Sequence, residues 1–138
     1  MAVAPLAFIT GASSGIGQAL ALRYVAAGWR VALVARRQAE LTAWAAAQGW
    51  PAGRWQVYGA DVAVIDAIVA AGQACIAAQG VPDVVIANAG ISVGMDTAER
   101  DDIDVMARTF AVNNTGMAAT FHPFVEPMRQ RGSGTLVA

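Results

Sequence analysis

Short runs of consecutive apolar residues alternate along this chain with longer stretches in which apolar residues recur at helical spacing. Runs of this kind, bounded by glycine or polar residues, are typical of β-strands that are buried on both faces. We therefore expect strands at Pro5–Thr10, Arg30–Ala35, Arg54–Ala60, Asp83–Asn88 and Gly134–Ala138.

Helices are expected between these strands. The first has Ile16, Leu20 and Tyr24 four residues apart and ends before Gly28, a typical stop signal. Asp61 is expected to cap the third helix, because a carboxylate can accept hydrogen bonds from the first free N–H groups. The predicted helices cover Gly15–Ala27, Gln38–Gln48, the stretch after Asp61, and Asp101–Gln130, the last interrupted or kinked at Asn113–Asn114, Gly116, Pro123 and Pro127.

The alternation of doubly apolar strands with helices predicts an α/β fold. Parallel strands need helical crossovers, and these crossovers cover both faces of the sheet. The handedness of the crossovers favours a doubly wound parallel sheet of the Rossmann type. No internal repeat or linker divides residues 1–138, so we expect one domain.

Composition narrows the classes of function. The chain is 57% hydrophobic and 14% charged, with a net charge of -1, which argues against disorder and against a nucleic-acid partner. No apolar run is long enough to cross a membrane, and the first ten residues lack the features of a signal peptide, so we expect a cytoplasmic protein. The single cysteine, Cys75, is expected in the core.

The stretch "TGASSGIG" places three glycines where the first strand turns into the first helix. Gly11, Gly15 and Gly17 would let a ligand approach the backbone closely, and the free N–H groups of the helix suit a pyrophosphate. Ser13 and Ser14 add hydroxyl and backbone donors. The alternative is a tight connection without a ligand, which is less attractive because glycines in a first helical turn reduce stability.

The chain resembles the short-chain dehydrogenase/reductase family in four segments. Thr10–Gly17 matches the cofactor loop T-G-x-x-x-G-x-G, and Ala87–Gly90 resembles N-N-A-G with alanine in the first place. Ala60–Asp61 matches an acidic position that meets the adenine, and Val112–Gly116 resembles the segment with the catalytic asparagine. The resemblance implies a cofactor site formed by Gly11, Ser13, Ser14, Gly15, Ile16, Gly17, Asp61, Val62, Asn88, Ala89 and Gly90. It also implies that Asn113 is catalytic and helps to hold a water in a proton relay.

The end of the second strand indicates which nicotinamide cofactor is bound. NAD-binding units usually carry an acidic residue there, which accepts hydrogen bonds from the ribose 2′-hydroxyl. This chain instead has Arg36 and Arg37, with no acid before Glu40. Guanidinium groups bind a 2′-phosphate, so we expect NADP rather than NAD, with Arg36 as the stronger candidate. The alternative is a solvated pair of surface arginines.

The proton-transfer residues of the family are not found in these 138 residues. The family uses a serine that follows the fifth strand and a Tyr-x-x-x-Lys pair, whereas this chain contains no lysine, and its tyrosines are Tyr24 and Tyr58. A fifth strand that is apolar on both faces would also leave an exposed sheet edge. We therefore expect the chain to be the N-terminal part of a longer enzyme, with the sheet truncated in the fifth strand.

Three functions remain open at this point. The first is an NADP-dependent oxidoreductase that transfers a hydride between the nicotinamide and a small carbonyl or alcohol substrate. The second is a non-catalytic NADP-binding module. The third is an interaction protein that kept the fold and lost the ligand, and the retained glycines argue against it.

The remaining features point to structural roles. His122 lies away from every motif and is expected on a helix surface, and no set of residues has the spacing of a metal site. Family members commonly pair through their long helices, so the resemblance implies a homo-oligomer for the full-length protein. The apolar residues between Met106 and Phe124 fit either such pairing or packing on the sheet.

Overall fold

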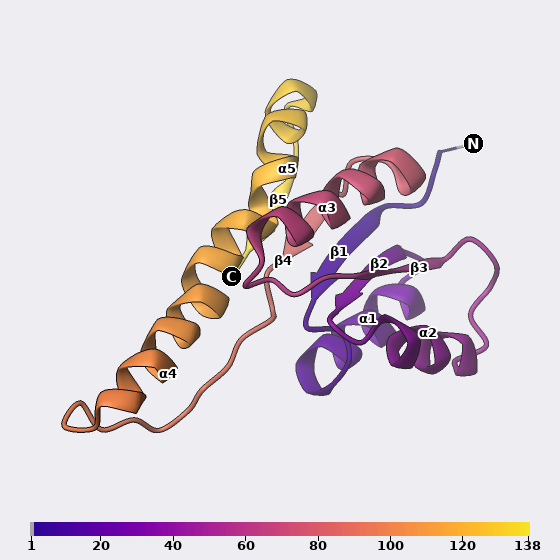
Figure 1. The fold of residues 1–138 in the computed structure, drawn as a ribbon. Coiled ribbons are helices and arrows are strands. Elements are labelled where there is room, and N and C mark those ends of the chain that lie inside the picture. Colours follow the sequence, from indigo (N-terminus) through magenta and orange to yellow (C-terminus); the bar gives the residue numbers. More distant parts are fainter. Residues whose placement is uncertain (1) are drawn as a thin grey trace.

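The central strand β1 (Leu6–Thr10) organises a five-stranded parallel sheet in the computed structural model, which describes residues 2–138 (Figure 1). The strand order is β3-β2-β1-β4-β5. The other strands are β2 (Arg30–Ala35), β3 (Trp55–Gly59), β4 (Val84–Ile86) and β5 (Thr135–Val137). The predicted parallel, doubly wound sheet is confirmed, and its strands lie within the predicted ranges.

Alternate residues of β1 supply two separate cores. Leu6 and Phe8 pack toward α3 (Ile65–Gln79) and α5 (Gly116–Arg131), whereas Ala7 and Ile9 pack toward α1 (Gly15–Ala26) and α2 (Gln38–Ala47). Figure 1 shows these two helical layers on opposite sides of the sheet. All five residues of β1 are buried, which explains why the strand is a continuous apolar run.

The predicted cap of the third helix is wrong. The carboxylate of Asp61 accepts a hydrogen bond from the Ala63 amide at 2.9 Å, and the helix begins only at Ile65. Its N-cap residue is Val64, which makes no side-chain cap. An aspartate can close a turn with an amide two residues on, and this turn competes with helix capping.

A long helix passes from α4 (Arg100–Phe110) through the π-helical turn η1 (Ala111–Thr115) into α5 (Figure 1). The expected interruption at Asn113–Asn114 is therefore a widened turn, and the chain stays helical. Pro123 and Pro127 lie inside α5 without ending it, and Gly132, at φ 77°, follows its last residue.

The apolar residues of this long helix divide between the sheet and solvent. Phe124 is fully buried and its ring meets that of Phe8 edge-to-face, with centroids 4.8 Å apart. Gly72 of α3 packs against this part of α5, and a Cβ at Gly72 would collide with Pro123. Phe110, in contrast, is 55% exposed. Packing on the sheet thus accounts for Phe124 but not for Phe110.

The apolar core on the α3 side contains Cys75, which is buried as expected. Burial raises the pKa of its thiol from 9.0 to about 12, although neighbouring Tyr58 and Arg30 lower it in part. The Tyr58 hydroxyl, whose pKa burial also raises, donates a hydrogen bond to the Gln79 side chain at 3.0 Å. His122 is exposed on α5, as expected.

Replacing Phe124 by alanine should lower the free energy of unfolding by about 3–5 kcal/mol, because a buried aromatic ring is lost and a cavity remains. The matched control is Val125→Ala at the neighbouring exposed position, which should cost less than about 1 kcal/mol. Chemical denaturation of both variants measures the difference. Equal losses would contradict the assignment of Phe124 to the core.

Cys75 should resist thiol reagents in the folded protein at pH 8, because the thiol is both buried and protonated. Labelling should become fast after denaturation, and the Cys75→Ala variant identifies the signal of this thiol. Since the folded pKa is raised, stability should fall as the pH rises from about 9 toward 12, where only the unfolded thiol releases its proton. Fast labelling of the native protein would contradict this burial.

Candidate functional site

A cavity of about 340 Å³ opens at the carboxyl edge of the sheet, where β1 and β4 lie side by side. The chain leaves β1 toward one side of the sheet and β4 toward the other, and ligands of open α/β sheets bind at such a switch point. Of the predicted site residues, the cavity brings together Gly11, Ser13, Ser14, Gly15, Ile16, Arg36, Asp61, Val62, Asn88, Ala89 and Gly90. Gly17, Arg37 and Asn113 do not line it.

The glycine turn is shaped by contacts that exclude side chains. Gly11 has φ 64°, and a Cβ at this position would lie 2.9 Å from the Ala89 Cα. Gly17 is buried, and a Cβ there would collide with the Gly11 carbonyl. Gly17 therefore lets α1 approach β1, which explains why it does not itself reach the cavity.

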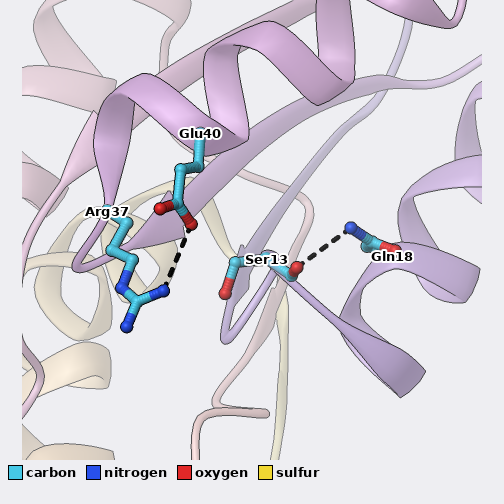
Figure 2. A network of polar contacts seen from close by, with 4 residues as sticks. All are labelled: Ser13, Gln18, Arg37 and Glu40. Carbon is cyan, nitrogen blue, oxygen red and sulfur yellow. Dashed lines mark hydrogen bonds and ion pairs between the residues drawn. The ribbon is translucent and has the colours of Figure 1, made fainter.

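The N-terminus of α1 faces the cavity with its donors uncapped. Ser14 is the N-cap residue but makes no side-chain cap, and the first turn contains no acidic residue. Ser13 and Ser14 are exposed on the cavity wall. The Gln18 side chain donates a hydrogen bond to the Ser13 carbonyl at 2.9 Å (Figure 2). This bond ties the glycine turn to the first turn of α1. Free N–H groups at a positive helix end suit an anionic group.

Asn88 joins the loops that follow β1 and β4. Its side-chain amide donates to the carbonyls of Thr10 at 3.2 Å and Gly11 at 3.3 Å. The Thr10 hydroxyl accepts a hydrogen bond from the Ala89 amide at 3.0 Å. These bonds set the distance between the two loops.

The two arginines after β2 have different surroundings. Arg36 lines the cavity, whereas Arg37 forms an exposed ion pair with Glu40 at 3.5 Å, at the start of α2 (Figure 2). An exposed pair of this kind contributes little to stability. Arg36 is therefore the arginine that lines the cavity, whereas Arg37 pairs with a residue of α2.

Asn113 holds the loop that follows β4. Its side-chain oxygen accepts from the Ile91 amide at 2.8 Å, and its nitrogen donates to the Ile91 carbonyl at 2.7 Å. A Cβ on neighbouring Gly90 would lie 3.4 Å from the same oxygen. The widened turn η1 thus places Asn113 where both ends of its amide bind one backbone residue.

Asp61 and Val62 form the wall on the side of β3. Val62 is buried, and Gly116 packs so closely on it that a Cβ would lie 2.8 Å from the Val62 carbonyl. The Asp61 carboxylate is held by the Ala63 amide and lines the cavity at the end of β3. The contact at Gly116 joins this wall to the long helix.

Several residues line the cavity that were not predicted as site residues from the sequence: Val34, Ala35, Ala60, Ile91, Arg108 and Val112. Most follow directly from the ends of the predicted strands. Arg108 and Val112 had a weaker signal, which is their spacing of about two turns and one turn before Gly116.

Within residues 2–138, no three His, Cys, Asp or Glu side chains gather to hold a metal ion. No helix in this part of the chain combines the length and the apolar character needed to cross a membrane.

Comparison with known proteins places this geometry in a family. The family model described as short chain dehydrogenase matches residues 5–138. The chain is 37% identical over 130 residues to the dehydrogenase/reductase SDR family protein 7-like of Drosophila melanogaster, with 91% of this chain and 40% of the relative covered. It is 31% identical over 132 residues to D-threitol dehydrogenase of Mycolicibacterium smegmatis, with 96% of this chain and 50% of the relative covered.

Solved structures agree with these relatives. A short-chain dehydrogenase from Streptomyces avermitilis superposes with a TM-score of 0.87 at 31% identity, and the match covers 99% of this chain and 48% of that one. The chain thus spans about half the length, or less, of the proteins that it matches. Its parallel sheet, glycine turn and matched range agree in one conclusion: the chain belongs to the short-chain dehydrogenase/reductase family.

Proposed function

We propose that this chain is the cofactor-binding part of an NADP-dependent oxidoreductase that transfers a hydride between the nicotinamide and a small carbonyl or alcohol substrate. One observation carries the proposal: the glycine turn, the uncapped start of α1 and Arg36 all line one cavity at the carboxyl edge of the sheet. Membership of a family of oxidoreductases supports the reaction class. The proposal includes the cytoplasmic location and the homo-oligomer expected from the sequence.

The residues fit a dinucleotide. The left-handed glycines Gly11 and Gly15 expose backbone at the turn, and a Cβ built on Gly15 would point into open space. The uncapped N–H groups of α1 and the hydroxyls of Ser13 and Ser14 would bind the pyrophosphate. Asp61 and Val62 would border the adenine, while Ala89 and Gly90 would border the nicotinamide side.

Arg36 would bind the 2′-phosphate that distinguishes NADP from NAD. It follows β2 directly and lines the cavity, and its charge suits a phosphate dianion. Arg37 would contribute less, since its guanidinium is shared with Glu40. No carboxylate of the cavity wall lies at the end of β2, where it would repel this phosphate.

A bound nicotinamide supplies or accepts the hydride, and this chain's residues would hold and orient it. Asn113 fixes Ile91 through two hydrogen bonds, and so positions the loop between Gly90 and the open side of the cavity. The resemblance assigns Asn113 a place beside a water in a proton relay. We propose that it serves both purposes.

A second candidate function, a non-catalytic NADP-binding module, has its own supporting observation. The two tyrosines of the chain are poorly suited to proton transfer, since Tyr24 packs edge-to-face on Trp29 and burial raises the pKa of Tyr58. Neither is followed by a lysine, and these 138 residues contain none. A serine and a Tyr-x-x-x-Lys pair elsewhere in the full-length protein would favour the oxidoreductase.

Arg36→Ala should weaken NADPH binding to the full-length protein by roughly 10- to 100-fold, because a charge-assisted contact is lost. Affinity for NADH should change less than about threefold, since NADH lacks the phosphate. Arg37→Ala is the matched control and should have a smaller effect. Isothermal titration calorimetry with NADPH and with NADH measures both dissociation constants. Equal affinity for both in the native protein, unchanged in Arg36→Ala, would contradict the preference for NADP.

Asn113→Ala should lower kcat for NADPH-dependent reduction of a carbonyl panel by at least about tenfold, within the range of a lost proton-transfer contact. The dissociation constant of NADPH should change less than kcat, because Asn113 reaches the cavity only through its two hydrogen bonds to Ile91. The neighbouring exposed residue gives the control, Asn114→Ala, which should keep its activity. A loss of thermal stability with normal kcat would assign Asn113 a purely structural role.

A further inference from the structure

Arg108 lines the same cavity as the glycine turn, but no cofactor motif of the chain includes it. It lies in the last turn of α4. Its side chain is exposed, so the protein interior does not explain its presence at the cavity.

The guanidinium of Arg108 has no partner within the described residues 2–138. Asp104, one turn earlier on α4, has the spacing of a helical ion pair with it. That carboxylate instead pairs with Arg100 at 3.0 Å. The ion pairs and side-chain hydrogen bonds found in this range do not include Arg108. The side chain is therefore available to a ligand.

The wall beside Arg108 identifies the part of the ligand that it would meet. Val112, one turn later, lines the cavity too, and Gly116 packs directly on Val62. This row of the long helix therefore faces the end of β3, where Asp61 and Val62 would border the adenine. Arg36 enters the same cavity from the end of β2.

We infer that Arg108 is a nucleotide-binding residue that stacks its guanidinium on the adenine base of the cofactor, covering it from the α4 side. This inference rests on the proposed function. A planar guanidinium stacks well on an aromatic face, and the apolar neighbours Val62 and Val112 suit the base rather than a phosphate. Arg36 and Arg108 thus divide their tasks, with Arg36 binding the 2′-phosphate and Arg108 the base.

Three small ligands separate these tasks in competition against NADPH on the full-length protein. AMP carries the base without a 2′-phosphate, adenosine 2′,5′-bisphosphate carries both, and nicotinamide mononucleotide carries neither. Arg108→Ala should weaken AMP and the bisphosphate by the same factor, roughly fivefold to twentyfold, and leave the mononucleotide unchanged. Arg36→Ala should weaken only the bisphosphate among these ligands.

Two further variants make the result specific to stacking. Arg108→Lys keeps the charge without the planar face and should lose nearly as much AMP affinity as Arg108→Ala. Arg129→Ala removes an exposed arginine that pairs with Glu126 on α5, outside the cavity, and should leave all three ligands unchanged.

The outcomes that overturn the inference differ from those that overturn the proposed function. Unchanged AMP affinity in Arg108→Ala, a loss confined to the bisphosphate, or full rescue by Arg108→Lys would each overturn stacking on adenine while nucleotide binding stands. If the native protein bound neither NADPH nor NADH, the proposed function would fail and the inference with it.

Discussion

The close approach of backbone at Gly11 is the constraint on which the candidate site depends. Three segments meet there without side chains between them: β1, the start of α1 at Gly17, and the loop after β4 at Ala89. A Cβ on Gly11 or Gly17 would push these segments apart, and the hydrogen bonds of Asn88 to the Thr10 and Gly11 carbonyls would lengthen. The uncapped N–H groups of α1 face the cavity only because this contact holds the helix against the strand end.

Much of the fold could be predicted from hydrophobic pattern alone. Strands buried on both faces are continuous apolar runs, so β1 and β2 were found almost to the residue. The Asp61 cap was predicted wrongly because an aspartate can cap a helix or close a turn, and local sequence does not decide between these competing bonds. The way the long helix continues through Asn113 as a π-helical turn also depends on tertiary contacts, here the two bonds to Ile91.

The residues of the candidate site that belong to a single turn or to the end of a single strand could be predicted from local sequence. The glycine turn and the residues after β4 needed no knowledge of distant segments. Arg108 required such knowledge, because its place at the cavity comes from the packing of the long helix on the end of β3 through Gly116. Arg37 shows the opposite case, since the sequence places it beside Arg36 while its ion pair with Glu40 directs it to α2.

The widened turn η1 also bears on the rotational phase between the two halves of the long helix. A residue advances an α-helix by about 100°, and a π-helical turn contains more residues than an α-helical one. Each residue of the π-helical turn advances the chain by less than about 100°, so the five residues Ala111–Thr115 cover about the rotation of four residues in a regular α-helix. The turn takes up the extra length, and α5 still presents buried residues such as Phe124 to the sheet, whereas α4 has no buried residue. The widened turn at Asn113 thus adds chain length without changing the face that α5 turns toward Phe8.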